Sequence, residues 1–211
     1  MKVMLVNGSP HKAGTTNRAL DEIQKTLEAD GIEVGRFWVG NKPIAGCIGC
    51  GYCASHDGEC VFNDIVNEFN HIAKDYDGFV FGTSVHYAAA TGAITSFMDR
   101  SFYSQACGGV NLYPLKPAAA VVCARRGGCS STFDQINKYF TIVQMPVISS
   151  SYWNMVYGNT SEEAEQDAEG MRTMRVLAHN MAYFLKCREA ANEAGIALPE
   201  VEPPARTNFI R

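Results

Sequence analysis

The chain has 211 residues, of which 46% are hydrophobic, and its 18 Lys and Arg against 22 Asp and Glu leave a formal charge of −4. This length and composition predict a single domain with one sizeable core. The acidic balance provides no basic face for a phosphate backbone, which argues against nucleic acid as a partner. The apolar runs are too short to span a membrane, and residues 1–7 lack the pattern of a secretory signal, so we expect a cytoplasmic protein.

The cysteine content is unusual for such a protein, at eight residues. Cytosolic thiols are kept reduced, and stable disulfides are rare in that compartment. The cysteines therefore need a chemical role other than cross-linking.

Segments with strand character alternate along the chain with segments of helical character. Strands are predicted at 2–7, 33–39, 78–83, 117–124 and 146–151, and the last three are nearly continuous apolar runs, as expected for parallel strands buried on both faces. Helices are predicted at 16–30, 64–76, 92–106, 132–143 and 161–194. The alternation predicts right-handed βαβ units and an open parallel sheet in a three-layer α/β domain.

Residues 1–195 are expected to form this domain, with a cysteine-rich insertion at 46–60. Gly195 is the expected end of the last helix. Residues 196–211 contain three prolines and show little periodicity, so we expect an extended C-terminal tail over the surface or over a partner subunit.

The loop at 8–17, after the first strand, has the composition of a phosphate-binding loop. Its glycines, its hydroxyl and amide side chains and the free N–H groups of the following helix would form a cradle for an anion. The dinucleotide fingerprint does not fit, because Pro10 stands where the second Gly should be, and the Walker A pattern does not fit, because Thr15 stands where the Lys should follow. The loop suits a monophosphate held by neutral donors, as in FMN; a helix cap with a polar turn is the alternative.

This loop and several later segments resemble the NADPH-dependent FMN reductase group of flavodoxin-like proteins. The similar segments are 8–17, 87–92 with 97–100, 125–128, and 151–154 with 166–170, which together extend over most of the chain. The resemblance implies a flavodoxin-like three-layer sandwich with a five-stranded parallel sheet of order 2-1-3-4-5. It also implies FMN outside the carboxyl ends of strands one, three and four, which agrees with the general rule that ligands bind at the switch point of an open α/β sheet.

The resemblance assigns FMN contacts to three segments of this sequence. The phosphate would be held by Ser9, His11, Thr15, Thr16 and Asn17; the ring would be lined by Thr83, Ser84, Val85, His86 and Tyr87, and its other edge by Ala124, Arg125, Arg126, Gly127 and Gly128. Arg125 and Arg126 would favour the reduced flavin or hold the 2′-phosphate of NADPH, with a solvated surface role as the alternative. His11 departs from the Arg or Lys usual in the group, which predicts weaker or pH-dependent phosphate binding.

Half of the cysteines form one C-x₂-C-x₂-C-x₆-C run, at Cys47, Cys50, Cys53 and Cys60. The first three have the opening spacing of a ferredoxin cluster, and intervening glycines allow the backbone to curl around a metal centre. The segment is similar to that of the iron–sulfur flavoproteins within the group, which implies a 4Fe–4S iron–sulfur cluster. Structural zinc, reduced thiols without metal and oxidised pairs are the alternatives.

Four further cysteines are dispersed along the chain. Cys123 lies in an apolar strand and is expected to be a core thiol, whereas Cys129 follows the predicted flavin loop and is a candidate reactive thiol. Asp99 and Arg100 are expected to be structural, anchoring a helix or a subunit contact.

Together these features predict an FMN-dependent NAD(P)H oxidoreductase that passes electrons to a small-molecule acceptor such as a flavin, quinone or nitro compound. No side chain is assigned a catalytic role, because stacking of the nicotinamide on the flavin supplies proximity and orientation. The alternative is an iron–sulfur electron carrier that accepts electrons from ferredoxin; a metal-scaffolded interaction protein is a third, weaker hypothesis. The resemblance further implies a homodimer or homotetramer, with Tyr152, Trp153 and the cysteine loop near a neighbouring site.

Overall fold

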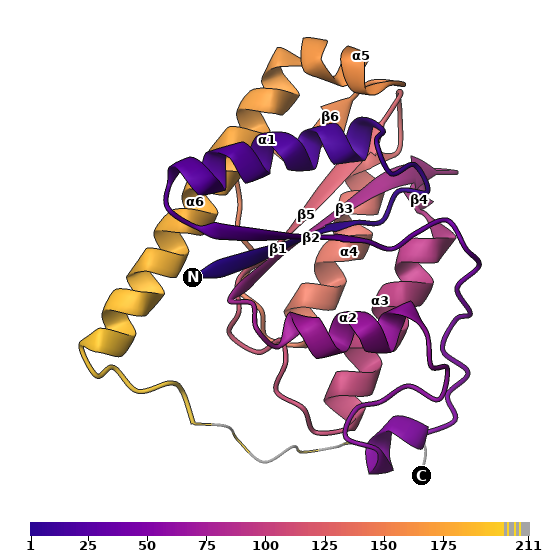
Figure 1. The fold of residues 1–211 in the computed structure, drawn as a ribbon, viewed down its shortest axis with the longest axis vertical. Helices are drawn as coiled ribbons and strands as arrows, with labels where there is room; N and C mark the ends of the chain where they lie inside the picture. The colour runs from indigo at the N-terminus through magenta and orange to yellow at the C-terminus, as the bar shows by residue number, and fades with distance from the viewer. Residues whose placement is uncertain (201, 203–204, 206, 208–211) are drawn as a thin grey trace.

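The computed structural model describes residues 1–200, 202, 205 and 207, and its centre is a twisted parallel sheet (Figure 1). The strand order is β2-β1-β3-β5-β6. The strands are β1 (Lys2–Asn7), β2 (Glu33–Trp38), β3 (Gly78–His86), β5 (Ala118–Ala124) and β6 (Met155–Tyr157), and the two-residue β4 (Ala89–Ala90) pairs antiparallel with the end of β3. This confirms the flavodoxin-like order 2-1-3-4-5 expected for five parallel strands.

Helices cover both faces of the sheet, as Figure 1 shows. One face carries α1 (Thr15–Ala29), α5 (Ser161–Gln166) and α6 (Ala168–Glu193), and the other carries α2 (Ile65–Ala73), α3 (Gly92–Cys107) and α4 (Cys129–Ile142). Successive strand residues point to opposite faces. Leu5 and Val80 therefore join the core under α1 and α6, whereas Met4 and Phe79 join the core under α2 and α3.

The fifth strand differs from the prediction at 146–151. In that segment only Val147 forms a bridge, with Ala118, and the chain rejoins the sheet later as β6. In the gap between them the buried Asn154 side chain donates to Ala120 O at 3.0 Å, which satisfies part of the β5 edge that a continuous strand would have paired. The predicted position of the strand was wrong because the apolar run does not show that a side-chain amide, rather than a backbone N–H, pairs with this part of β5.

The final helix is divided, although a single helix was predicted at 161–194. Asp167 lies between α5 and α6, where its carboxylate accepts from Gly170 N at 2.9 Å and from Tyr157 N at 2.7 Å. It thus caps α6 and holds β6 at the same time. Gly195 follows α6 in the left-handed region, with φ of 73°, as expected for a helix end. No helix in the described part of the chain combines the length and apolar character that a membrane crossing requires.

Candidate functional site

The three segments that were predicted to contact FMN lie at the carboxyl ends of β1, β3 and β5, which are neighbours in the sheet. Their carboxyl ends therefore meet at one edge, at the point where the strand order reverses. Gly8 N donates to Gly82 O at 2.8 Å, and Thr91 Oγ1 donates to Gly8 O at 3.2 Å. A Cβ on Gly128 would lie 2.6 Å from Ala88 Cα, so the loop after β5 touches the loop after β3.

The amino end of α1 is open to an anion. Gly14 is its N-cap and supplies no side-chain hydrogen bond to the first turn. The first N–H groups of a helix point out of its end and carry a partial positive charge, which favours a phosphate. The loop before α1 is held by the end of β2, because Trp38 Nε1 donates to Ser9 O at 2.9 Å.

Side chains of the phosphate loop are mostly directed elsewhere. Thr15 Oγ1 donates to Gly158 O and Thr160 O, each at 3.2 Å, and the Asn17 amide donates to Asp21 at 2.9 Å. Thr16 is buried. This arrangement leaves backbone N–H groups, rather than these three side chains, as the donors that face the loop opening.

Ser9 and His11 remain beside that opening. Ser9 is buried, and its hydroxyl accepts from His11 N at 3.2 Å, while the His11 side chain is exposed. Neither side chain donates a hydrogen bond to another described residue.

The end of β3 presents polar and aromatic groups under backbone strain. Thr83 is buried and donates to its neighbour's carbonyl, whereas the Ser84 hydroxyl oxygen is buried and has no hydrogen-bond partner among the described residues. Val85 and His86 pair with β4, and the intervening turn holds Tyr87 and Ala88 at φ of 50° and 59°. Two consecutive residues with side chains in this region are uncommon and occur where the fold imposes them. The turn leaves the Tyr87 ring fully exposed.

The loop after β5 carries unpaired cations. Arg125, Arg126 and Gly127 are exposed, and neither guanidinium has an ion-pair partner in the part of the chain that the structure describes. Gly128 adopts φ of 94° and caps α4. Ala124, at the end of β5, is buried.

These groups fit FMN on chemical grounds. An uncapped helix end suits the phosphate, the unpartnered Ser84 hydroxyl suits a polar edge of the ring, and an exposed aromatic side chain suits stacking. Arg125 and Arg126 add positive charge at the same edge of the sheet, where a reduced flavin would become anionic.

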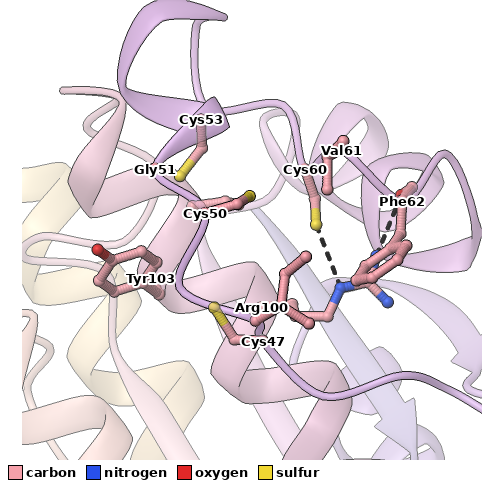
Figure 2. Close-up of a pocket in the computed structure, with 11 residues that line it drawn as sticks. Cys47, Cys50, Gly51, Cys53, Cys60, Val61, Phe62, Arg100 and Tyr103 are labelled. Carbon is pink, nitrogen blue, oxygen red and sulfur yellow. Dashed lines mark hydrogen bonds between the residues drawn. The ribbon is translucent and has the colours of Figure 1, made fainter.

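The second site is the cysteine loop, which packs against α3. Cys47, Cys50, Cys53 and Cys60 line one pocket, together with the apolar side chains of Ile48, Val61 and Phe62 and with Arg100, Tyr103 and Ser104 of α3. Figure 2 shows the four sulfur atoms turned toward the space between them. Cys47 and Cys50 are exposed, Cys60 is half-buried and Cys53 is buried. The predicted ligands are thus brought together.

Backbone contacts hold this loop in place. Gly49 and Gly51 adopt φ of 64° and 71°, which lets the chain turn sharply before the short 3-10 helix η1 (Tyr52–Ser55). The buried Asn67 of α2 clamps Cys60, because its side chain accepts from Cys60 N and donates to Cys60 O, each at 2.9 Å. The Cys60 side of the cysteine pocket is therefore fixed to α2.

Arg100 lies beneath the cysteine pocket and is buried. Its Nε donates to Cys60 Sγ at 3.2 Å, and its two terminal nitrogens donate to Asp64 at 2.7 and 2.8 Å (Figure 2 shows the sulfur contact). Burial opposes the charge of Arg100, but the hydrogen bonds that it donates to Asp64 and Cys60 outweigh burial and raise the pKa of the guanidinium. Asp64 has its pKa lowered because the bonds from Arg100 and Val66 N outweigh burial.

The Cys53 thiol is protonated at neutral pH in the absence of a metal. Burial raises its pKa to about 11, and the hydrogen-bonded thiol of Cys107 contributes to the same shift. Metal binding at this position would therefore release a proton, as thiolate ligation requires.

The ligand-type side chains that line the cysteine pocket are four thiols, with no His, Asp or Glu among the lining residues of the described chain. The described residues include no group of three or more Cys, His, Asp or Glu side chains close enough to bind one ion together. In a 4Fe–4S cluster each thiolate binds a different corner iron, so the sulfurs stand further apart than around zinc. Four thiols line the cysteine pocket, which is the number and type of ligand that such a cluster takes.

Sequence reasoning overlooked Asn67 at this site and the contact of Arg100 with Cys60. Asn67 and Arg100 contact Cys60, and the signal for Arg100 was its place one helical turn before Tyr103 and Ser104 on the same helix face. Arg100 is structural, as predicted, but it also faces the cysteines. Cys129 is buried and burial raises its pKa, so the structure does not support a reactive thiol there; Cys123 is a core thiol, as predicted.

Comparison with known proteins gives a consistent result. The family described as NADPH-dependent FMN reductase matches residues 1–160. An iron–sulfur flavoprotein of Methanocaldococcus jannaschii is 30% identical over 192 residues, which are 88% of this chain and 98% of that protein. Among solved structures, RosB with a bound 8-demethyl-8-formylriboflavin-5′-phosphate intermediate has a TM-score of 0.68 at 15% identity, over 100% of this chain and 94% of its own. FerB of Paracoccus denitrificans, an NAD(P)H:acceptor oxidoreductase, has a TM-score of 0.63 at 15% identity, over 87% and 98% of the two chains.

Proposed function

The chain belongs to the NADPH-dependent FMN reductase family, and we propose that within it the protein is an iron–sulfur flavoprotein that passes electrons to a small-molecule acceptor. FMN binds at the carboxyl edge of the sheet, and a 4Fe–4S cluster is held by Cys47, Cys50, Cys53 and Cys60. The observation that carries the proposal is that these four thiols line one pocket. The match to the family and the similarity to an iron–sulfur flavoprotein of Methanocaldococcus jannaschii support it.

Bound FMN supplies hydride and single-electron chemistry at its ring. The chain's own groups bind and orient it. The open end of α1 holds the phosphate through backbone N–H groups, with Ser9 and His11 beside it. The exposed Tyr87 would stack on the ring, and the exposed Arg125 and Arg126 would stabilise the negative charge of the reduced flavin. Binding energy and orientation, rather than a proton-transferring side chain, are the contribution of the protein.

Two sources of electrons are compatible with the two sites. NAD(P)H would reduce the flavin directly, and the exposed Arg125 and Arg126 favour this route because a nucleotide phosphate needs such cations. A carrier such as ferredoxin would reduce the cluster instead, and the exposure of Cys47 and Cys50 favours that route. The resident cofactors are the same in both routes.

The cofactor content of the protein tests the proposal. Protein purified without oxygen should contain flavin and about four irons and four sulfides per chain. The Cys50→Ser variant should lose the iron and keep the flavin. Cys187→Ser is the matched control, because Cys187 is exposed and lies outside the cysteine loop, and it should keep both. Iron retained in Cys50→Ser, or zinc in place of iron, would contradict the proposed cluster.

Anaerobic reduction separates the two electron sources. If NADPH or NADH is the donor, the flavin absorbance bleaches rapidly on its addition, and Arg125→Ala with Arg126→Ala raises the nicotinamide concentration needed. If a carrier is the donor, reduced ferredoxin bleaches the flavin, nicotinamides leave it oxidised, and the two Arg variants behave as wild type.

A further inference from the structure

Arg100 is a buried charge with one donor directed at a predicted cluster ligand. The residue is 1% exposed, and its Nε–H donates to Cys60 Sγ at 3.2 Å. A buried cation is retained in a fold only where other groups satisfy it. The groups that bond to Arg100 therefore indicate its role.

The terminal nitrogens of Arg100 are occupied by oxygen acceptors. One donates to Asp64 at 2.7 Å and to Ala45 O at 3.4 Å, and the other donates to Asp64 at 2.8 Å and to Phe62 O at 3.0 Å. These contacts fix the plane of the guanidinium and tie it to both flanks of the cysteine loop. Only Nε is left for sulfur, and the fixed plane aims it at Cys60.

We propose that Arg100 is a positioning residue for the iron–sulfur site, which holds the Cys60 thiolate by a charge-assisted hydrogen bond and raises the reduction potential of the cluster. The inference rests on the proposed function, since it requires a cluster on Cys60. Reduction adds one electron to the cluster and neither forms nor breaks a bond to the protein. A hydrogen bond to a ligand sulfur and a nearby positive charge both stabilise the added negative charge.

Asp64 has the opposite electrostatic effect through the same contact. Its carboxylate offsets part of the charge of Arg100, and its side chain is 37% exposed, so its charge is better screened by solvent than the buried guanidinium. Glu59, next to Cys60, is paired with His71 at 2.6 Å. Arg100 is thus the cation in direct contact with a cysteine of the pocket, and Asp64 sets how much of its charge the cluster experiences.

The test is a redox titration of the cluster in the holoprotein, followed by electron paramagnetic resonance of the reduced form. Three variants are compared with wild type. Arg100→Gln removes the cation and should lower the midpoint potential, whereas Asp64→Asn keeps Arg100 and removes the compensating anion, so it should raise the potential. Arg100→Lys keeps the charge but lacks the planar guanidinium that aims a donor at Cys60, so the midpoint potential should fall less than in Arg100→Gln.

The opposite directions distinguish this role from a structural one. Both Arg100→Gln and Asp64→Asn break the ion pair. If the pair only supported the fold, both variants would lose stability, and the cluster potential would not shift in opposite directions. Equal potentials in all four proteins, or a decrease in Asp64→Asn, would overturn the proposal. Should Arg100→Gln fail to fold, the predicted increase in Asp64→Asn and decrease in Arg100→Lys still decide it.

Different results would overturn this inference and the proposed function. A wild-type protein that binds no iron and sulfide after anaerobic purification or reconstitution overturns both. A wild-type protein with an intact cluster, combined with unshifted potentials in the variants, overturns the role of Arg100 alone.

Discussion

Gly108 allows the end of α3 to press directly against the cysteine loop. A Cβ at this position would overlap the backbone nitrogen of Gly58 and lie 2.9 Å from Cys53 O. Backbone atoms cannot yield as a side-chain tip does, so Gly108→Ala should push the loop away from α3. We expect the free energy of unfolding to fall by about 1–3 kcal/mol and the iron content to fall with it.

Gly46→Ala is the matched control for this prediction. Gly46 lies in the same loop, and the nearest atom to its added Cβ is Ser96 Oγ at 3.9 Å, an ordinary contact. Denaturant unfolding without oxygen, together with iron analysis, should find Gly46→Ala within about 0.5 kcal/mol of wild type. Similar losses in the two variants would show that the close approach of Gly108 to Gly58 does not hold the loop.

Residue types in the flavin loops were predictable, but the directions of their side chains were not. Thr15, Thr16 and Asn17 were expected to face a phosphate because hydroxyl and amide groups near a glycine-rich turn suit that role. The acceptors of Thr15, which are Gly158 O and Thr160 O, come from a segment more than 100 residues away. A local pattern contains no information about such distant acceptors, so it cannot distinguish a phosphate donor from a tertiary cross-link.

At the scale of elements, α1 and α6 are joined by a charged contact over the core that they share. Glu22 accepts from Arg175 at 2.6 Å and from Arg18 at 3.0 Å. Burial by itself would raise the pKa of Glu22, but the hydrogen bonds from Arg175 and Arg18 outweigh it and lower the pKa below its ordinary value. A lowered pKa in the folded state means that the ionised carboxylate stabilises the fold.

This contact predicts a stability difference that depends on pH. Glu22→Gln should lower the free energy of unfolding by about 1 kcal/mol at pH 7. Stabilisation by Glu22 is fully present above the unfolded pKa of about 4.3 and is lost as the pH falls through the lower folded pKa, so the difference between the proteins should shrink in that acidic range. Urea unfolding from pH 7 to pH 3 measures it.

Glu165→Gln is the control for Glu22→Gln. Glu165 also bonds Arg18, at 2.9 Å, but its side chain is 60% exposed. Exposed ion pairs contribute little, so we expect a change of no more than about 0.5 kcal/mol at any pH. A difference between wild type and Glu22→Gln that stays constant down to pH 3 would contradict the assigned role of the carboxylate.

The order and type of most elements followed from the sequence because burial periodicity is strong in a parallel sheet covered on both sides. The displaced fifth strand and the divided last helix share one cause. Asn154 completes a strand edge and Asp167 divides a helix, and in each case a polar side chain replaces a backbone partner. Such a replacement depends on which distant segments lie next to each other in the fold, and hydrophobic periodicity does not predict that.

In the whole molecule, α3 runs from one candidate site to the other. Thr91 at its amino end donates to Gly8 O in the flavin loop, and Tyr103, twelve residues later, lines the cysteine pocket. At 1.5 Å per residue this places the two sites roughly 18 Å apart along a helix. Substitutions at such a separation, with no shared contacts, are expected to act independently.

Independence can be tested with one variant at each site. Tyr87→Ala removes a fully exposed ring, so it should leave the fold intact while weakening FMN binding about tenfold, the effect of losing roughly 1.4 kcal/mol of stacking. Cys50→Ser should abolish iron binding and leave the FMN dissociation constant unchanged. In the double variant both losses should appear with the magnitudes of the single variants, within about 0.5 kcal/mol for FMN. Fluorescence titration of apoprotein with FMN and iron analysis measure the two sites separately, and FMN affinity that depends on the cluster would show instead that α3 couples them.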